Sequence, residues 1–317
     1  MRLFCPLHVI IPSASENSFR GGPSMQAGTA ILHKISQNRL FLRIFLYFLC
    51  ILIPAIILAG SYYFHILQTL RDDFSEKTEI NLRNSTNAVG FYLATVQKTS
   101  VNFFTDESIR RLLLPADQLT DDQRAELAAI PRVLSSSTLN LDHYASQVFV
   151  ISDLSRVFTR NGAERFSFFF NNTYPYERYP QQFWQNKLDN AKPFEILPPS
   201  KLQSTDRIVI PFVAKSVIKG NPAIIVFNIS EDSIRNTLES SALFASTRFI
   251  VLDHNGEVIL NTFGESANIL LDSISVPAKS ANHSSVASYN NQSYLINSTT
   301  LDPFDWTFYA ITPNKEF

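Results

Sequence analysis

The stretch from Ile44 to Phe64 constrains the fold of this 317-residue chain more than any other, because it contains no charged side chain. About 20 apolar residues are what an α-helix needs to cross the ~30 Å hydrocarbon core of a membrane. Pro54 lies near its middle, and membrane helices tolerate proline where neighbouring groups bind the freed carbonyl. Tyr62 and Tyr63 suit the interface with water. We therefore predict one membrane-spanning helix within residues 39–66.

The charges on either side of this stretch predict its orientation. The residues before the stretch include one acid, Glu16, and five basic residues: Arg2, Arg20, Lys34, Arg39 and Arg43. The side of a membrane helix that carries more lysine and arginine usually stays in the cytoplasm. Residues 1–38 are therefore predicted to be a cytoplasmic tail, and residues after about 66 are predicted to lie outside the cell. The alternative is a cleaved signal peptide, whose apolar region is shorter, at roughly 7–15 residues. Met25 is an alternative start of the chain.

Composition excludes several classes of function. The formal charge of −1 gives no electrostatic footprint for nucleic acid, so this segment is not expected to contact it. The two cysteines are Cys5 and Cys50, so the region after the span must be stabilised by packing without disulfides. The six histidines are scattered, and no H-E-x-x-H, G-x-S-x-G or phosphate-loop motif occurs. We expect no enzyme activity in this segment, and no metal or cofactor.

Residues 67–140 are predicted to be a long entry helix followed by short helices. Apolar residues recur every seven positions on the long helix, at Leu82, Val89, Val96 and Phe103, with Leu93 on the same flank. Such a stripe packs on a partner helix or a sheet, and it would also suit a homodimer. Asp106 is predicted to cap a short helix. Thr120 begins a capping box for another helix, which is expected to end before Pro131.

After residue 140 the pattern changes to short β-branched and apolar runs, typical of strands. A strand pair, a helix and three strands occur twice, in residues 141–245 and 246–317. The turns are expected at Asn221-Pro222 in the first unit and at Asn255-Gly256 in the second, where both residues should take positive φ. A further helix is predicted at Glu265–Ser273. The fold class is therefore α+β, with two PAS-like antiparallel-sheet units after the long helix.

The chain resembles the double Cache sensor region of Gram-positive sensor histidine kinases and of membrane-bound AraC-type regulators. The resemblance covers roughly residues 35–317. It rests on the apolar N-terminal run, the strand QVFVIS, the run RIVIPFVAKS…GNPAIIVFNIS, the hairpin FIVLDHNGEVILNT and the terminal strand DWTFYAITPNKEF. It implies an extracytoplasmic sensor in a two-component or similar system, a homodimer, and a small-molecule ligand or a binding protein as partner.

The resemblance also implies a second span and an output domain after Phe317, so that the chain is interpreted as a fragment. Two alternatives stay open. One is the sensor half of a chemotaxis receptor, and the other is a membrane-tethered surface binding protein.

The resemblance places the ligand in the membrane-distal unit, where an aromatic-rich segment lies. Its candidate binding residues are Phe170, Tyr176, Arg178, Tyr179 and Trp184. A guanidinium among aromatic rings can hold a carboxylate or stack on a sugar. No aspartate can be placed that would hold the amine of an amino acid. The alternative is that this segment simply contributes the apolar face of a core helix.

Overall fold

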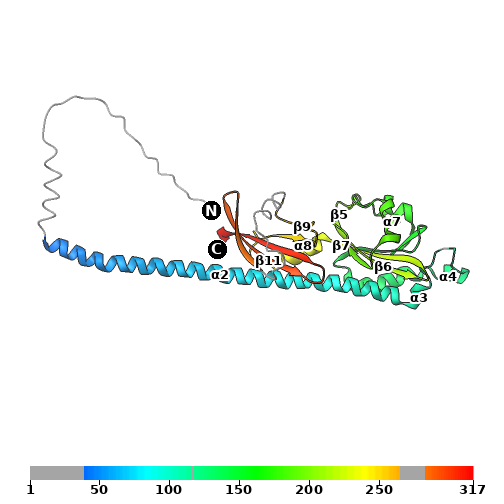
Figure 1. Ribbon diagram of the computed structural model, residues 1–317, viewed down its shortest axis with the longest axis horizontal. Helices are drawn as coiled ribbons and strands as arrows, with labels where there is room; N and C mark the ends of the chain where they lie inside the picture. Colours follow the sequence, from blue (N-terminus) through cyan, green and yellow to red (C-terminus); the bar gives the residue numbers. More distant parts are fainter. Residues whose placement is uncertain (1–38, 116, 265–282, 317) are drawn as a thin grey trace, which may run out of the picture. The chain divides into compact units, whose positions relative to one another are not determined.

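The computed structural model describes residues 39–115, 117–264 and 283–316, and it divides into two compact units between Ile66 and Leu67 (Figure 1). The predicted cytoplasmic tail, the helix expected at Glu265–Ser273 and the span expected after Phe317 lie outside the described residues.

The first described element is one helix, α2, which runs from Arg39 to Thr105 and includes Pro54. Its N-terminal part is long enough and apolar enough to cross a membrane. The apolar side chains there are exposed; Ile51, Leu58 and Phe64 each leave more than half of their surface uncovered. The predicted long apolar helix at the start of the chain is confirmed.

From Leu67 onward α2 belongs to the second unit, where it lies along both sheets (Figure 1). The predicted stripe is fully buried here; its members are Leu82, Val89, Leu93, Val96 and Phe103. These side chains share one apolar core with strands of both sheets. The stripe therefore packs on its own chain. The expectation that it could also form a dimer interface is wrong, because no surface of it is left for a second copy.

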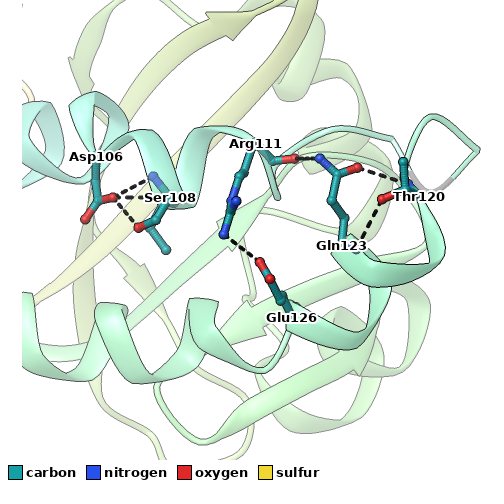
Figure 2. Close-up of polar contacts among 7 residues, drawn as sticks. Asp106, Ser108, Arg111, Thr120, Gln123 and Glu126 are labelled. Atoms are coloured by element: carbon teal, nitrogen blue, oxygen red, sulfur yellow. Dashed lines mark hydrogen bonds and ion pairs between the residues drawn. The ribbon is translucent and has the colours of Figure 1, made fainter.

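The segment that follows α2 is held by polar contacts (Figure 2). The carboxylate of Asp106 accepts hydrogen bonds from the backbone N–H groups of Ser108 (2.9 Å) and Ile109 (3.4 Å), as predicted for a helix cap. Thr120 and Gln123 form the predicted capping box. These contacts bind the N–H groups that a helix start leaves without partners.

Figure 2 also shows how the short helices are held together. Arg111 pairs with Glu126 at 2.7 Å and accepts a hydrogen bond from the Gln123 side chain through its carbonyl. The helices are α3 (Glu107–Arg110), α4 (Asp121–Glu126), α5 (Ala129–Thr138) and the 3-10 turn η1 (Leu139–Leu141). The helix begun at Thr120 ends at Glu126, before Pro131 as expected. Pro131 itself lies in the first turn of the next helix, α5, where a missing N–H costs nothing.

The first sheet contains seven described strands and carries one layer of helix and loop on the face away from α2. Its strands are β1 (Ala145–Ile151), β2 (Arg156–Thr159), β3 (Gly162–Arg165), β4 (Phe194–Ile196), β5 (Ser200–Lys201), β6 (Ile208–Ile218) and β7 (Asn221–Ser230). Between β3 and β4 come α6 (Phe166–Phe168), the π-helix η2 (Phe169–Thr173) and α7 (Gln181–Asn190). The spatial order is β3-β2-β1-β7-β6-β4, with β5 beside β6, and every pair is antiparallel.

The helix α8 (Glu231–Glu239) leads into the second sheet, which has five described strands. They are β8 (Arg248–Leu252), β9 (Val258–Asn261), β10 (His283–Tyr289), β11 (Gln292–Leu301) and β12 (Trp306–Pro313), and η3 (Asn314–Glu316) follows. Their order is β10-β11-β12-β8-β9. In both sheets the last strand in the chain lies in the centre, beside the first strand of that sheet. The two sheets therefore share one strand order. The predicted tandem of antiparallel-sheet units is confirmed.

Two predicted turns form differently from expectation. The loop between β6 and β7 is Lys219-Gly220, with φ of 49° and 86°, because Asn221 and Pro222 already pair with β6. Both central residues have positive φ, as two-residue hairpins favour.

The second turn joins β8 to β9, and here only Gly256 has positive φ. The carboxylate of Asp253 accepts the backbone N–H groups of Asn255 and Glu257 at 2.8 Å each, and this longer turn replaces the expected two-residue one. The hairpin itself is present.

The central strands are continuous apolar runs because their side chains point alternately to two covered faces of the sheet. On β7, Ile225, Phe227 and Ile229 face the α2 side, whereas Ile224 and Val226 belong to a second core on the opposite face. Successive side chains of a strand point to opposite faces, so a sheet covered on both faces needs apolar residues at every position.

Candidate functional site

The second core of the first sheet is an aromatic cluster on the face away from α2. It draws side chains from β1, from the π-helix, from the loop before α7 and from α7 itself: Phe149, Phe166, Phe169, Phe170, Tyr176, Tyr179 and Trp184 are buried, with Tyr174 and Phe183 packed against them. We call this set the distal aromatic cluster. π-Helices are rare and occur frequently at functional sites.

Trp184 is the centre of this cluster. Its ring stacks on Phe170 with centroids 5.5 Å apart and an interplanar angle of 14°. Tyr176 and Phe149 approach the same ring at 5.3 and 5.6 Å. The side chain of Trp184 has no exposed surface. Four of the five candidate residues named from the sequence, all except Arg178, are therefore in one packed group.

Hydroxyl groups tie the cluster to the sheet. The Tyr176 hydroxyl donates to Oδ1 of Asn228, a fully buried residue of β7, at 2.7 Å. The Tyr179 hydroxyl donates to the carbonyl of Pro198 at 2.6 Å. The hydroxyls of Tyr174 and Ser146 are 3.2 Å apart. Each tyrosine thus keeps a polar partner while its ring is buried, as buried tyrosines require.

Two buried donors in this region lack a partner among the described residues. They are Nε1 of Trp184 and Nδ2 of Asn228. A buried polar group without a hydrogen bond costs roughly 1–3 kcal/mol. Such groups therefore mark places where a water or a ligand with an acceptor atom would bind favourably.

Burial also raises the pKa of the cluster's phenols. It raises the pKa of Tyr174 to about 12 and that of Tyr179 to about 12, and it holds the pKa of Tyr176 well above 10. At neutral pH these groups are neutral hydroxyls, able both to donate and to accept hydrogen bonds.

Arg178 lies outside the distal aromatic cluster. Its guanidinium is half exposed and pairs with Glu257, in the β8–β9 turn, at 3.4 Å. Its backbone N–H donates to the Ser200 hydroxyl. The residue thus links the loop before α7 to the second sheet.

One largely buried carboxylate lies on this face of the sheet. Glu195 of β4 pairs with Val213 of the second core, and its side chain, 14% exposed, forms an ion pair with Lys187 of α7 at 2.7 Å. Glu231 is buried too, but it begins α8, whose buried residues Ile234 and Leu238 belong to the α2-side core. Within the described ranges no three His, Cys, Asp or Glu side chains are close enough to hold a metal ion.

Asn228 is a residue of the candidate site that the sequence reasoning missed. A signal for it existed, because it is the one polar residue within the apolar run Ile224–Ile229. Alternation places it on the same face as Ile224 and Val226 and hence toward the aromatic segment.

The comparisons with known proteins give a fold and no family. No protein-family model matches the sequence, and no curated protein matches it either. Several solved structures do match. The sensory domain of the Campylobacter jejuni chemoreceptor Tlp3, with isoleucine bound, is 13% identical with a TM-score of 0.52, covering 78% of this chain and 96% of that one.

Two further chemoreceptor domains agree. The ligand-binding domain of the Pseudomonas fluorescens chemoreceptor CtaA, in complex with L-isoleucine, is 10% identical with a TM-score of 0.53, covering 78% of this chain and 96% of that one. The ligand-binding domain of Mlp24 with asparagine is 13% identical with a TM-score of 0.50, covering 77% and 94%. The described chain has the fold of these sensory domains.

Proposed function

We propose that the chain is the extracytoplasmic ligand-sensing region of a transmembrane signalling receptor. The observation that carries this is α2, a single helix that contains both the apolar stretch and the residues buried against the two sheets. The basic residues before the stretch support a cytoplasmic N-terminus, with residues after about 66 outside the cell.

Signalling requires only that a ligand favour one of two arrangements of the sheets against α2. A preference of a few kcal/mol is sufficient to shift such an equilibrium. The output would be a histidine kinase or an AraC-type DNA-binding domain. A chemotaxis receptor is the second candidate, favoured because the similar solved structures named above are chemoreceptor domains.

The ligand site in this proposal is the distal aromatic cluster, with Phe170, Tyr176, Tyr179 and Trp184 as contacts. The ligand would bring acceptor atoms to Nε1 of Trp184 and Nδ2 of Asn228. The carboxylate of Glu195 on this face is already paired with Lys187 of α7 at 2.7 Å, so an ammonium group would have to compete with that lysine. The proposed site therefore favours a neutral or anionic small molecule over an amino acid. Arg178 could join the ligand only by leaving Glu257.

A homodimer through α2 would use the face opposite the buried stripe. Ile80, Phe91 and Val101 are exposed there, and they fall at the a and d positions of one heptad register. Phe91 leaves 68% of its surface uncovered. The proposed dimer is parallel, since both copies would start from the same membrane.

A ligand screen on the full chain in lipid nanodiscs tests the proposed function. Sugars, organic acids and amino acids are added in turn, and binding is detected as a rise in the melting temperature. A ligand of the distal site should bind at least several-fold more weakly to Trp184→Phe, which removes the unpaired donor and keeps an aromatic ring. The matched control is Trp306→Phe, in the second sheet. Equal affinity of every ligand found for the wild type and for Trp184→Phe would contradict this site.

A further inference from the structure

The face that α2 buries against the sheets changes character along the helix. Between residues 75 and 86 it buries three polar side chains and one apolar one: Thr78, Ser85, Thr86 and Leu82. Between residues 89 and 104 it buries one polar side chain and five apolar ones: Ser100, Val89, Leu93, Val96, Phe103 and Phe104. We call residues 75–86 the polar segment of α2 and residues 89–104 its apolar segment.

The polar segment contacts the second sheet and the loop between α8 and β8. Oγ of Ser75 and Oγ of Ser284, in β10, are 2.9 Å apart. In the loop, Ser241 accepts a hydrogen bond from Oγ of Ser85 on its hydroxyl at 2.5 Å and one from Nδ2 of Asn81 on its carbonyl at 3.0 Å. Contacts of this kind add little net stability, because water offers the same groups equivalent partners.

Three buried polar atoms at this contact lack a partner among the described residues. They are Oγ1 of Thr78, Oγ1 of Thr86 and Oδ1 of Asn297, a fully buried residue of β11. Nδ2 of Asn297 reaches the carbonyl of Ser75 at 3.5 Å, which is longer than a normal hydrogen bond. Unpaired buried atoms oppose the closed contact, because each has given up its hydration without a replacement.

The apolar segment is held by burial of apolar surface. Leu93, Val96 and Phe103 belong to the core that α2 shares with the sheets. Ser100 and Phe104 line one hollow with residues 214 and 216 of β6, in the first sheet. Separating this segment from the sheet would expose apolar side chains to water, for which water offers no compensating contact. The two segments should therefore open at different free energies.

We propose that the contact between the polar segment of α2 and the second sheet is the movable contact of this region, while the apolar segment stays fixed to the first sheet. Opening of the polar segment exchanges hydroxyl and amide contacts for contacts with water, and of its buried side chains only Leu82 is apolar. The opening itself needs no ligand. Its use in signalling rests on the proposed function, since the polar segment is the part of the buried face nearer in sequence to the apolar stretch.

Cysteine labelling of the full chain in nanodiscs, without any ligand, measures the opening of each segment. In a chain carrying Cys5→Ser and Cys50→Ser, a single cysteine replaces Ser85 or, as the matched control, Ser100. Both serines are buried on α2, and each donates to a carbonyl of its own helix. After correction for the rates in urea, Ser85→Cys should react with a thiol reagent faster than Ser100→Cys by about tenfold or more. Equal rates, or faster reaction of Ser100→Cys, would overturn the proposal.

A second probe covers the case in which Ser85→Cys fails to fold. Oγ1 of Thr86 has no partner among the described residues, so Thr86→Cys removes no hydrogen bond that the structure shows. Its control is Val96→Cys, in the apolar segment and fully buried. The same order of rates is expected, and equal protection of the two cysteines would contradict a movable polar segment.

Thr78→Val tests the cause of the opening. It removes an unpaired buried hydroxyl and nearly keeps the shape of the side chain, so the closed contact becomes more favourable. Labelling of Ser85→Cys should slow by about threefold or more. The matched control on the same helix is Thr95→Val, since Oγ1 of Thr95 donates to the carbonyl of Phe91 and lies outside the polar segment. Unchanged or faster labelling with Thr78→Val, or equal slowing with Thr95→Val, would refute the proposal.

Discussion

Trp184 contributes its ring, and not its N–H, to the packing of the first sheet. The ring contacts Phe170, Tyr176 and Phe149, whereas Nε1 has no partner among the described residues. At this one residue the requirements of stability and of the proposed ligand binding can therefore be separated.

Substitutions of Trp184 that remove the ring should therefore destabilise the protein more than those that remove only the N–H. Trp184→Ala should lower the unfolding free energy by about 3–5 kcal/mol, because it empties the centre of a packed cluster. Trp184→Phe should cost less than about 1.5 kcal/mol, since it removes an unpaired donor and keeps a ring. Urea unfolding of both variants measures the difference. A loss for Trp184→Phe as large as that for Trp184→Ala would show that the indole nitrogen is bonded in the folded protein.

Stability should fall at high pH because of the buried phenols. The pKa values of Tyr174 and Tyr179 are raised to about 12 in the folded state, against about 10 in an unfolded chain. Their contribution is complete below pH about 10 and is lost as the pH rises from about 10 to about 12. Tyrosinate absorbance should show the phenols of Tyr174, Tyr176 and Tyr179 titrating late, and one late phenol fewer in Tyr174→Phe. Ordinary titration of every tyrosine would contradict this burial.

The residues of the proposed site were only partly predictable. Aromatic density located Phe170, Tyr176, Tyr179 and Trp184, because rings this close in sequence tend to be buried together. Arg178 could not be placed, since its partner Glu257 lies 79 residues away and comes close only when both units are folded.

At the scale of elements, Gly90 allows α2 to approach the second sheet closely. A Cβ built on Gly90 would lie 2.5 Å from Cδ1 of Leu301, at the end of β11. Glycine lowers the helix propensity at this position, but its missing side chain allows the close contact between helix and strand.

A double-mutant cycle tests this contact. Gly90→Ala should lower the unfolding free energy by about 1 kcal/mol, because overpacking against Leu301 exceeds the gain in helix propensity. In a Leu301→Ala background the same change should be stabilising, since the space is then free. The same sign in both backgrounds would exclude Leu301 as the cause.

Elements were more predictable than their ends. Five strands of each sheet followed from β-branched and apolar runs, whereas the short strands β3 and β5 were missed. The caps at Asp106 and Thr120 followed from local hydrogen bonding that needs no distant partner. Turns were harder, because the pairing of whole strands decides which residues remain unpaired. Pro222, for example, lies within β7 opposite Val217.

At the scale of the whole molecule, the two sheets share α2 as a common support, and the apolar stretch belongs to the same helix. The sequence predicted this order of parts because periodicity changes sharply at residue 140. It could not predict which face of α2 would stay free, since that depends on how both sheets pack against it.

Disulfide cross-linking tests the proposed dimer face. In a chain carrying Cys5→Ser and Cys50→Ser, Phe91→Cys should form a covalent dimer in membranes on mild oxidation. Val96→Cys should not, because Val96 is fully buried against the sheets. Cross-linking only at Val96, or at none of positions 80, 91 and 101, would contradict a dimer through this face of α2.

The central claim is that the two-sheet unit lies outside the cell, and labelling of intact cells tests it most directly. In the same cysteine-free background a single cysteine is placed at the exposed Ser167 or, in a second chain, at Ser36. A membrane-impermeant maleimide should label Ser167→Cys in intact cells and Ser36→Cys only after lysis. Labelling of Ser36→Cys in intact cells, with Ser167→Cys protected until lysis, would contradict an extracytoplasmic sensor.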